Sequence, residues 1–196
     1  MSKLRYTQNE EEKYITESVS SIKNGRFLDI GAHDGITFSS TRRLWELGWT
    51  GVYVEPSPDV LPLLKQNTGS NCEILPVAIG SRCGNMDFYS SGTDMVGTLS
   101  TEHVALWSSA VSFSKTSVDV IDVNELSKRV GTNFDFIGID VEGINLEVFS
   151  QFDWSLWKPS CICVEYETHG HYMKSVLEKH GYRLSYASSE NLVFTK

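Results

Sequence analysis

The stretch Phe27-Leu28-Asp29-Ile30-Gly31-Ala32-His33-Asp34-Gly35 decides the fold of this chain. Its first four residues are largely apolar, as in a buried parallel strand, and residues 37–47 have the pattern of a helix that follows the strand. Gly31 and Gly35 lie where the backbone must turn sharply and approach a ligand closely. A strand, a glycine turn and a helix start together indicate a site for a nucleotide-type cofactor.

The spacing of the two glycines distinguishes this turn from that of the dinucleotide-binding enzymes. The chain carries D-x-G-x-x-x-G, whereas NAD-type dehydrogenases carry G-x-G-x-x-G. The second early glycine of that motif lets the backbone approach the pyrophosphate, but Ala32 and His33 follow Gly31 here. An NAD-type oxidoreductase is therefore a disfavoured alternative.

Length and composition limit the class of protein. The 196 residues are enough for one domain with a sizeable core, and 40% hydrophobic with 21% charged residues is usual for a globular fold. A formal charge of −8 disfavours nucleic acid as a partner, because phosphate binding needs an excess of Lys and Arg. No apolar run is long enough to span a bilayer, and the first residues lack a signal-peptide core, so we expect a cytoplasmic protein. The four cysteines form no C-x-x-C pair, and we expect no metal site from them.

Strand and helix patterns alternate along the chain, which predicts βαβ units and a mostly parallel sheet. After the first strand we expect strands at residues 51–55, 73–78, 85–90, 116–121, 134–140 and 161–167, and a closing antiparallel pair at 182–186 and 191–194. The other expected helices cover residues 10–23, 58–66, 122–129 and 172–179. Residues 92–112 show no clear periodicity and are interpreted either as a long loop at the acceptor site or as a mobile surface segment.

Three of the expected strands end in a carboxylate, namely Asp29, Glu55 and Asp140. Ligands of open α/β sheets bind at the carboxyl ends of the strands, so these acids should line one crevice. Glu55 follows Gly35 by 20 residues, a position from which a carboxylate can accept hydrogen bonds from both ribose hydroxyls. Asp29 either holds the glycine turn or reaches an ammonium group of the ligand.

The segment from Asp140 to Gly143 places two carboxylates, Asp140 and Glu142, beside a glycine. Such a pair can orient a ligand, act as a general base or bind a hard cation, or it can simply be the acidic start of the next helix. A second polar group follows the strand at 161–167 and comprises Glu165, Glu167, His169 and His171. Its functional interpretations are a metal-ligand set, a catalytic histidine or a role in the choice of acceptor, but an exposed loop position is favoured for each histidine.

Three segments in order resemble the FkbM family of S-adenosylmethionine-dependent methyltransferases. They are FLDIGAHDGITFSSTRRLWELGWTGVYVEPSP at residues 27–58, LPVAIG at 75–80 and FDFIGIDVEGINLEVF at 134–149. The resemblance implies a class I methyltransferase fold, which is Rossmann-like: a seven-stranded, mostly parallel sheet with a C-terminal antiparallel hairpin and helices on both faces. Known members act on hydroxyl groups of sugars and small molecules, so it implies a carbohydrate or small-molecule acceptor.

The resemblance also assigns roles by position. Asp29, Gly31, Ala32, His33 and Gly35 would lie at the methionine part of S-adenosylmethionine, Glu55 with Pro56 at the ribose, and Val77 with Ala78 near the adenine. Asp140 and Glu142 would lie where cofactor and acceptor meet. Asp140, Glu142 and His33 are the candidates for the base or for the group that orients the acceptor.

Two positions depart from the family pattern. The family often has Asn where this chain has His33, and it commonly reads D-x-E-G-x-E-L-E where Asn145 here replaces the middle acid. A non-catalytic cofactor-binding or assembly module with the same fold remains an alternative, because a fold alone does not confer activity. A nucleic-acid methyltransferase is disfavoured by the charge and by the lack of a D/N-P-P-Y/F motif.

Overall fold

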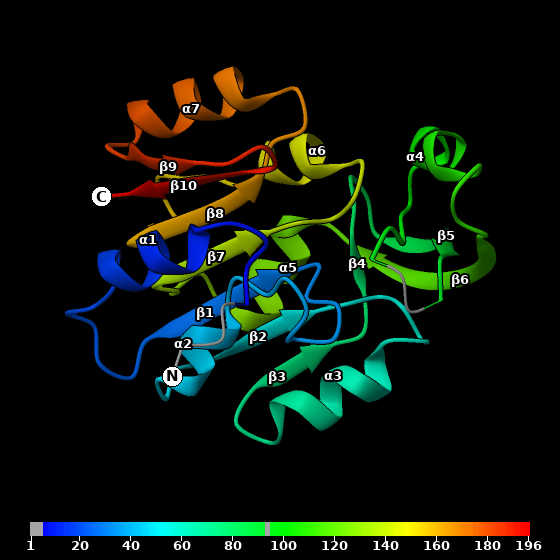
Figure 1. Cartoon of the computed structure of the whole chain (residues 1–196), viewed down its shortest axis with the longest axis horizontal. Coiled ribbons are helices and arrows are strands. Elements are labelled where there is room, and N and C mark those ends of the chain that lie inside the picture. Colours follow the sequence, from blue (N-terminus) through cyan, green and yellow to red (C-terminus); the bar gives the residue numbers. More distant parts are fainter. Residues whose placement is uncertain (1–5, 93–94) are drawn as a thin grey trace.

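Seven strands of the described residues, 6–92 and 95–196, form one twisted sheet in the computed structural model of this protein (Figure 1). Their spatial order is β3 (Glu73–Leu75), β2 (Thr50–Val54), β1 (Arg26–Ile30), β7 (Phe136–Ile139), β8 (Cys161–Glu165), β10 (Asn191–Thr195) and β9 (Arg183–Ala187). The first five are parallel, and β10 is antiparallel to β8 and to β9. The expected mostly parallel sheet with a C-terminal hairpin is confirmed.

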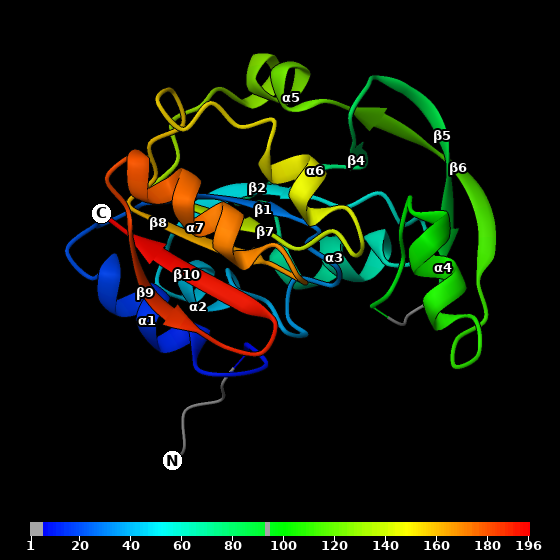
Figure 2. The same ribbon diagram turned by 90° about the horizontal axis from the view of Figure 1, so that it is seen from above.

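Helices cover both faces of this sheet (Figure 2). Because side chains alternate along a strand, Phe27 of β1 packs with α1 (Glu11–Ser18), α2 (Arg42–Glu46) and α3 (Leu61–Thr68), through Ile15, Leu44 and Leu64. Its neighbour Leu28 faces the opposite side. That side is covered by α5 (Val123–Val130), α6 (Asn145–Phe149) and α7 (Gly170–Lys179). The sheet is thus buried on both faces, as the continuous apolar strands require.

A small second sheet stands beside the carboxyl ends of the main sheet (Figure 1). It consists of β4 (Ala78–Ile79), β6 (Ser114–Ile121) and β5 (Gly84–Ser90). The single strand expected at 73–78 is wrong: Pro76 has no N–H for a ladder, and the chain leaves the main sheet there to enter the second one.

The segment expected as a loop contains a helix, α4 (Thr101–Trp107). Ser100 starts this helix, because its hydroxyl accepts a hydrogen bond from the N–H of His103. A serine N-cap is a sequence signal, but α4 buries no residue fully and therefore lacks the apolar periodicity of an ordinary helix.

The helix after the glycine turn starts five residues later than expected, at Arg42. The carboxylate of Asp34 accepts hydrogen bonds from the N–H groups of Ile36 and Thr37 and from the Thr37 hydroxyl. Phe38 then adopts a positive φ of 52°, which a right-handed helix excludes. The local side-chain hydrogen bonds therefore keep the backbone between residues 36 and 41 out of the helical conformation. Within the described ranges, no helix combines the length and the apolar character that a bilayer span requires.

Candidate functional site

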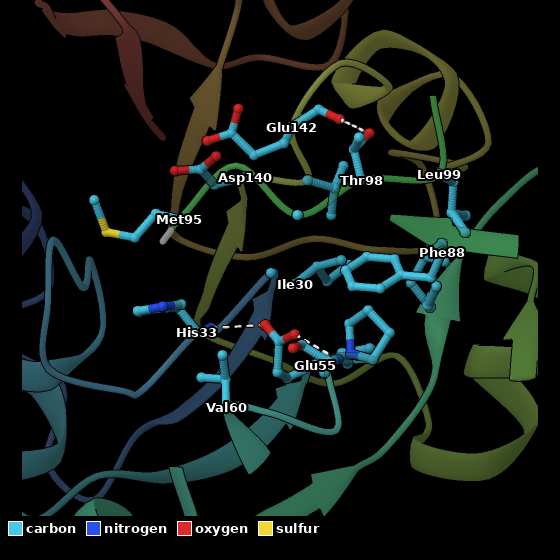
Figure 3. A pocket seen from close by; sticks show the side chains of 18 of the residues that line it. Ile30, His33, Glu55, Val60, Phe88, Met95, Thr98, Leu99, Asp140 and Glu142 are labelled. Carbon is cyan, nitrogen blue, oxygen red and sulfur yellow. Dashed lines mark hydrogen bonds between the residues drawn. The ribbon is translucent and has the colours of Figure 1, made fainter. Parts of the chain in front are cut away.

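A pocket opens at the carboxyl ends of β1, β2 and β7 (Figure 3). The structure brings most of the site residues expected from the sequence into its wall. They are Gly31, His33, Glu55, Pro56, Val77, Ala78, Asp140 and Glu142. Segments up to 111 residues apart thus meet at one end of the sheet, as the strand-end rule for open α/β sheets predicts.

Gly31 brings the ends of β1 and β7 into direct backbone contact. A Cβ atom at Gly31 would lie 1.6 Å from the carbonyl oxygen of Asp140, and Gly31 has a φ of +87°. The N–H of Asp140 donates to the carbonyl of Ile30 at 2.9 Å, which continues the ladder to the edge of the pocket. The glycine is therefore required both by its conformation and by the space available.

Glu55 is a buried carboxylate that the backbone holds in place. Its Oε2 accepts the N–H of His33 at 2.9 Å and its Oε1 accepts the N–H of Ser57 at 2.8 Å. Burial raises the pKa of Glu55 to about 6, and the two backbone hydrogen bonds oppose that shift. The group is thus ionised at neutral pH, and each oxygen keeps a further lone pair for a hydroxyl donor.

One wall of the pocket is apolar. The apolar residues there include Val60, Val77, Ala78, Phe88 and Leu99, of which Val60, Phe88 and Leu99 are labelled in Figure 3. Sequence analysis found Val77 and Ala78 but missed Val60, which lies just before α3. It also missed Phe88 and Leu99, because these two reach the pocket only through the second sheet and the segment beside it. No sequence pattern indicates that Phe88 and Leu99 lie in the wall of this pocket.

Three residues expected at the cofactor, Asp29, Ala32 and Gly35, do not line this pocket, and Ala32 lines a second pocket instead. Gly35 is turned away, and a Cβ atom there would meet Leu64 and Thr68 of α3. Asp29 is 6% exposed and accepts a short hydrogen bond from the Thr41 hydroxyl, while burial raises its pKa to about 6. It lines this second pocket, which adjoins the first. Gly35 therefore shapes the turn, and Asp29 faces the neighbouring cavity.

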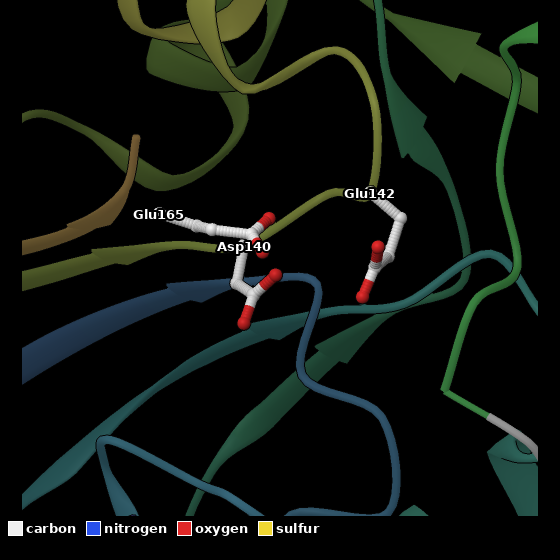
Figure 4. Close-up of side chains that lie close together, drawn as sticks. All are labelled: Asp140, Glu142 and Glu165. Carbon is white, nitrogen blue, oxygen red and sulfur yellow. The ribbon is translucent and has the colours of Figure 1, made fainter. Parts of the chain in front are cut away.

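Three carboxylates gather above the end of β7 (Figure 4). Oxygen atoms of Asp140, Glu142 and Glu165 all lie within 4.8 Å of one another. Partial loss of hydration in the cleft, followed by the charge of Glu142, raises the pKa of Asp140 to about 7, although its side chain remains open to the cleft. Burial, followed by the charge of a neighbouring carboxylate, raises the pKa values of Glu142 and Glu165 to about 8. Such a group can share a proton near neutral pH or hold a hard cation.

Glu142 is fixed by the segment before and inside α4, which sequence analysis did not connect with it. The hydroxyl of Thr98 donates to the carbonyl oxygen of Glu142 at 2.6 Å. Nε2 of His103 lies 3.3 Å from the Glu142 carboxylate, and the ring of His103 packs on Gly143. The segment from Thr98 to His103 thus clamps the turn that carries Glu142.

Asn145 forms hydrogen bonds that hold the same carboxylate cluster in place. It is fully buried, and its side-chain oxygen accepts the N–H of Val141 at 2.8 Å. Its amide nitrogen donates to Glu165 at 2.6 Å and to Glu167 at 3.4 Å. The departure from the family's acid at this position therefore supplies a hydrogen-bond donor where another carboxylate would add repulsion. His169 and His171 line neither of the two pockets described here.

Comparison with known proteins assigns a family and a fold. A family model described as the methyltransferase FkbM domain matches residues 29–184. Among solved structures, precorrin-6y C5,15-methyltransferase from Geobacter metallireducens GS-15 is 15% identical with a TM-score of 0.53, covering 100% of this chain and 92% of that chain. An O-methyltransferase from Bacillus cereus in complex with SAH is 14% identical with a TM-score of 0.51, covering 97% and 82%. The search of curated proteins gives no match.

Proposed function

Because the chain belongs to the FkbM methyltransferase family, we propose that it transfers a methyl group from S-adenosylmethionine to a hydroxyl group of a sugar or another small molecule. Methyl transfer follows from the family, and the choice of a hydroxyl acceptor is our inference. The observation that supports it is the carboxylate cluster, of which Asp140 and Glu142 line the pocket and have raised pKa values that suit the removal of a hydroxyl proton near neutral pH.

The residues of the first pocket fit the cofactor. Glu55 offers two oxygen atoms to a ribose diol, and the wall formed by Val77, Ala78 and Phe88 offers an apolar slot for a flat base. Gly31 and His33 line the same pocket after the end of β1, where the methionine part would pass. When bound, S-adenosylmethionine supplies a methyl group that is attached to a sulfonium sulfur. The remainder of the cofactor is the leaving group and becomes a neutral thioether.

The chain's own residues would align the acceptor and take its proton. As the hydroxyl oxygen forms its bond to the methyl carbon, the carbon–sulfur bond breaks and the hydroxyl proton passes to a carboxylate. We assign that transfer to Asp140 or Glu142, with His33 as the third candidate, since all three residues line both pockets. Alignment of two reactants in a dry pocket can lower the activation barrier by about 7–11 kcal/mol, so we expect positioning to contribute more to the rate than proton removal does.

The proposal is tested with labelled S-adenosylmethionine and a panel of hydroxyl acceptors, using wild type, Asp140→Asn and Glu142→Gln. We expect transfer by the wild type and a loss of roughly 100-fold or more in at least one variant. Cofactor binding without transfer to any acceptor would favour the non-catalytic module. Unchanged rates in both variants would remove the carboxylates from the mechanism. The expected cytoplasmic location stays a prediction.

A further inference from the structure

The carboxylates of Asp140, Glu142 and Glu165 lie close together at the ends of β7 and β8 (Figure 4). Oxygen atoms of all three lie within 4.8 Å of one another. Among the residues that the structure describes, no Lys or Arg forms an ion pair with any of them. Like charges this close repel one another, so either shared protons or a bound cation must offset the repulsion.

The side chain of His103 contacts this cluster at Glu142 and favours the bound cation. It is only 10% exposed, and its Nε2 lies 3.3 Å from Oε2 of Glu142. Nε2 is nevertheless buried without a hydrogen-bond partner among the described residues, so the two atoms approach each other without forming a hydrogen bond. A buried ring nitrogen without a partner is costly, and folded proteins rarely retain one that no ligand or water uses.

The distance between these two atoms fits neighbouring ligands on one metal ion. Carboxylate oxygens and imidazole nitrogens bind divalent transition ions at about 2.0–2.2 Å. Two ligands at that distance lie about 2.8–3.6 Å apart, from the right angle of an octahedron to the wider angle of a tetrahedron. The 3.3 Å between His103 Nε2 and Glu142 Oε2 falls within that range. A shared ion would therefore give the ring nitrogen the partner that it lacks.

Other contacts already hold the carboxylates in place. The amide of Asn145 donates to Glu165 at 2.6 Å, and the hydroxyl of Thr98 donates to the carbonyl oxygen of Glu142 at 2.6 Å. Metal ligands are commonly oriented by such neighbouring hydrogen bonds. Asp140 and Glu142 also line the first pocket, which gives an ion a way into the cluster.

We propose that Asp140, Glu142, Glu165 and His103 bind one divalent metal ion at the edge of the first pocket. Carboxylates suit Mg²⁺, Ca²⁺ and Mn²⁺, whereas an imidazole favours transition ions, so the combined set selects an ion such as Mn²⁺. The site does not depend on the proposed function. If that function holds, the ion would lie beside the acceptor and lower the pKa of its hydroxyl group, and a carboxylate bound through one oxygen keeps its second oxygen for the proton.

The site is tested by calorimetric titration of chelator-treated protein with manganese chloride, without cofactor or acceptor. The wild type should bind one Mn²⁺ ion per chain in a saturable manner. Glu165→Gln should weaken that binding at least about tenfold. Glu147→Gln should leave it unchanged, because Glu147 is an exposed acid in the first turn of α6. Thermal unfolding in the presence of the chelator confirms that each variant is folded.

His103→Phe tests the nitrogen ligand separately, because it keeps a ring and removes Nε2. We expect at least about tenfold weaker Mn²⁺ binding and Mg²⁺ binding within about threefold of the wild type, since Mg²⁺ prefers oxygen ligands. His171→Phe is the matched control, because His171 is exposed on α7, and it should retain the affinity for both ions.

Three results would overturn the proposal. They are the absence of saturable Mn²⁺ binding by the wild type, equal Mn²⁺ affinity of Glu165→Gln and Glu147→Gln, and unchanged Mn²⁺ affinity of His103→Phe. The first two would show that the carboxylates share protons instead, and the third would remove the imidazole from the ligand set. Because the titration contains neither cofactor nor acceptor, its failure would leave methyl transfer standing, and a failure of methyl transfer would leave the metal site standing.

Discussion

The carbonyl oxygen of Asp140 occupies the space that a side chain at Gly31 would need, with only 1.6 Å between that oxygen and a Cβ atom. The cofactor turn and the carboxylate cluster are therefore joined through backbone rather than through side chains. The N–H of Asp140 also donates to the carbonyl of Ile30 at 2.9 Å, so the two segments meet along their backbones. This contact couples the part of the site that would bind the cofactor to the part that would handle the acceptor.

Gly31→Ala is expected to reduce both stability and cofactor binding. The strained φ costs about 1–2 kcal/mol, and the collision with Asp140 adds about 1–3 kcal/mol. Gly48→Ala is a matched control, because Gly48 has the same φ of +87° with no atom within 4 Å of its Cβ position. Urea unfolding of the two variants isolates the cost of the contact. Equal destabilisation of both would show that the backbone contact is unimportant.

Stability should fall as the pH rises from about 4.5 to about 8. The carboxyls of Asp140, Glu142 and Glu165 have higher pKa values in the folded protein than in the unfolded chain, mainly because each loses hydration and then because they repel one another. The folded state therefore holds more protons in this range, and deprotonation destabilises it. Glu142→Gln removes one of the charges and should flatten the decline, as measured by urea unfolding at several pH values. An unchanged slope in this variant would contradict the assigned coupling.

Asn145→Asp is expected to destabilise the protein by at least about 1–3 kcal/mol, since it replaces a buried donor with a further negative charge beside Glu165. It should also raise the pKa of the cluster, so that the pH–rate profile moves to higher pH. Asn124→Asp serves as the control, because Asn124 is exposed in the first turn of α5. The account would be contradicted if the two variants had the same stability and the same profile.

Substitutions of His33 test whether cofactor affinity depends on its side chain or only on its backbone conformation. Its φ is 48°, a conformation that Asn also adopts readily, and its backbone N–H rather than its ring binds Glu55. His33→Asn should therefore retain cofactor affinity within about threefold, whereas His33→Val should cost about 1–3 kcal/mol of stability. Calorimetry and unfolding measure the two effects. A large loss of cofactor affinity in His33→Asn would place the imidazole on the cofactor instead.

The sequence predicted the features that depend on local patterns. The alternation of strands and helices gave the main sheet, and the acids at strand ends gave Glu55 and Asp140, because parallel strands bring their carboxyl ends together. The contacts across the two sheets could not be predicted in this way. Nothing in the residues around Thr98 indicates that its hydroxyl reaches Glu142, 44 positions away.

Other misses have a local physical reason. The helix was expected to start at residue 37, yet the carboxylate of Asp34 accepts the N–H groups of Ile36 and Thr37 and the helix starts later. The helix at residues 10–23 was expected, but the burial of Glu11 depends on the approach of α1 to β8 and β10. Tertiary packing determines where such a helix starts and which of its side chains are buried, and a single sequence does not reveal that packing.

The most direct test of the account is the binding of S-adenosylhomocysteine to wild type, Glu55→Gln and Glu73→Gln by calorimetry. Glu55 is the buried acid that would hold the ribose, and Glu73 is an exposed acid at the start of the neighbouring strand β3. We predict saturable binding by the wild type, at least about a tenfold weaker affinity for Glu55→Gln and no change for Glu73→Gln. Absence of binding by the wild type, or equal affinity of all three proteins, would contradict the assignment of this pocket to the cofactor.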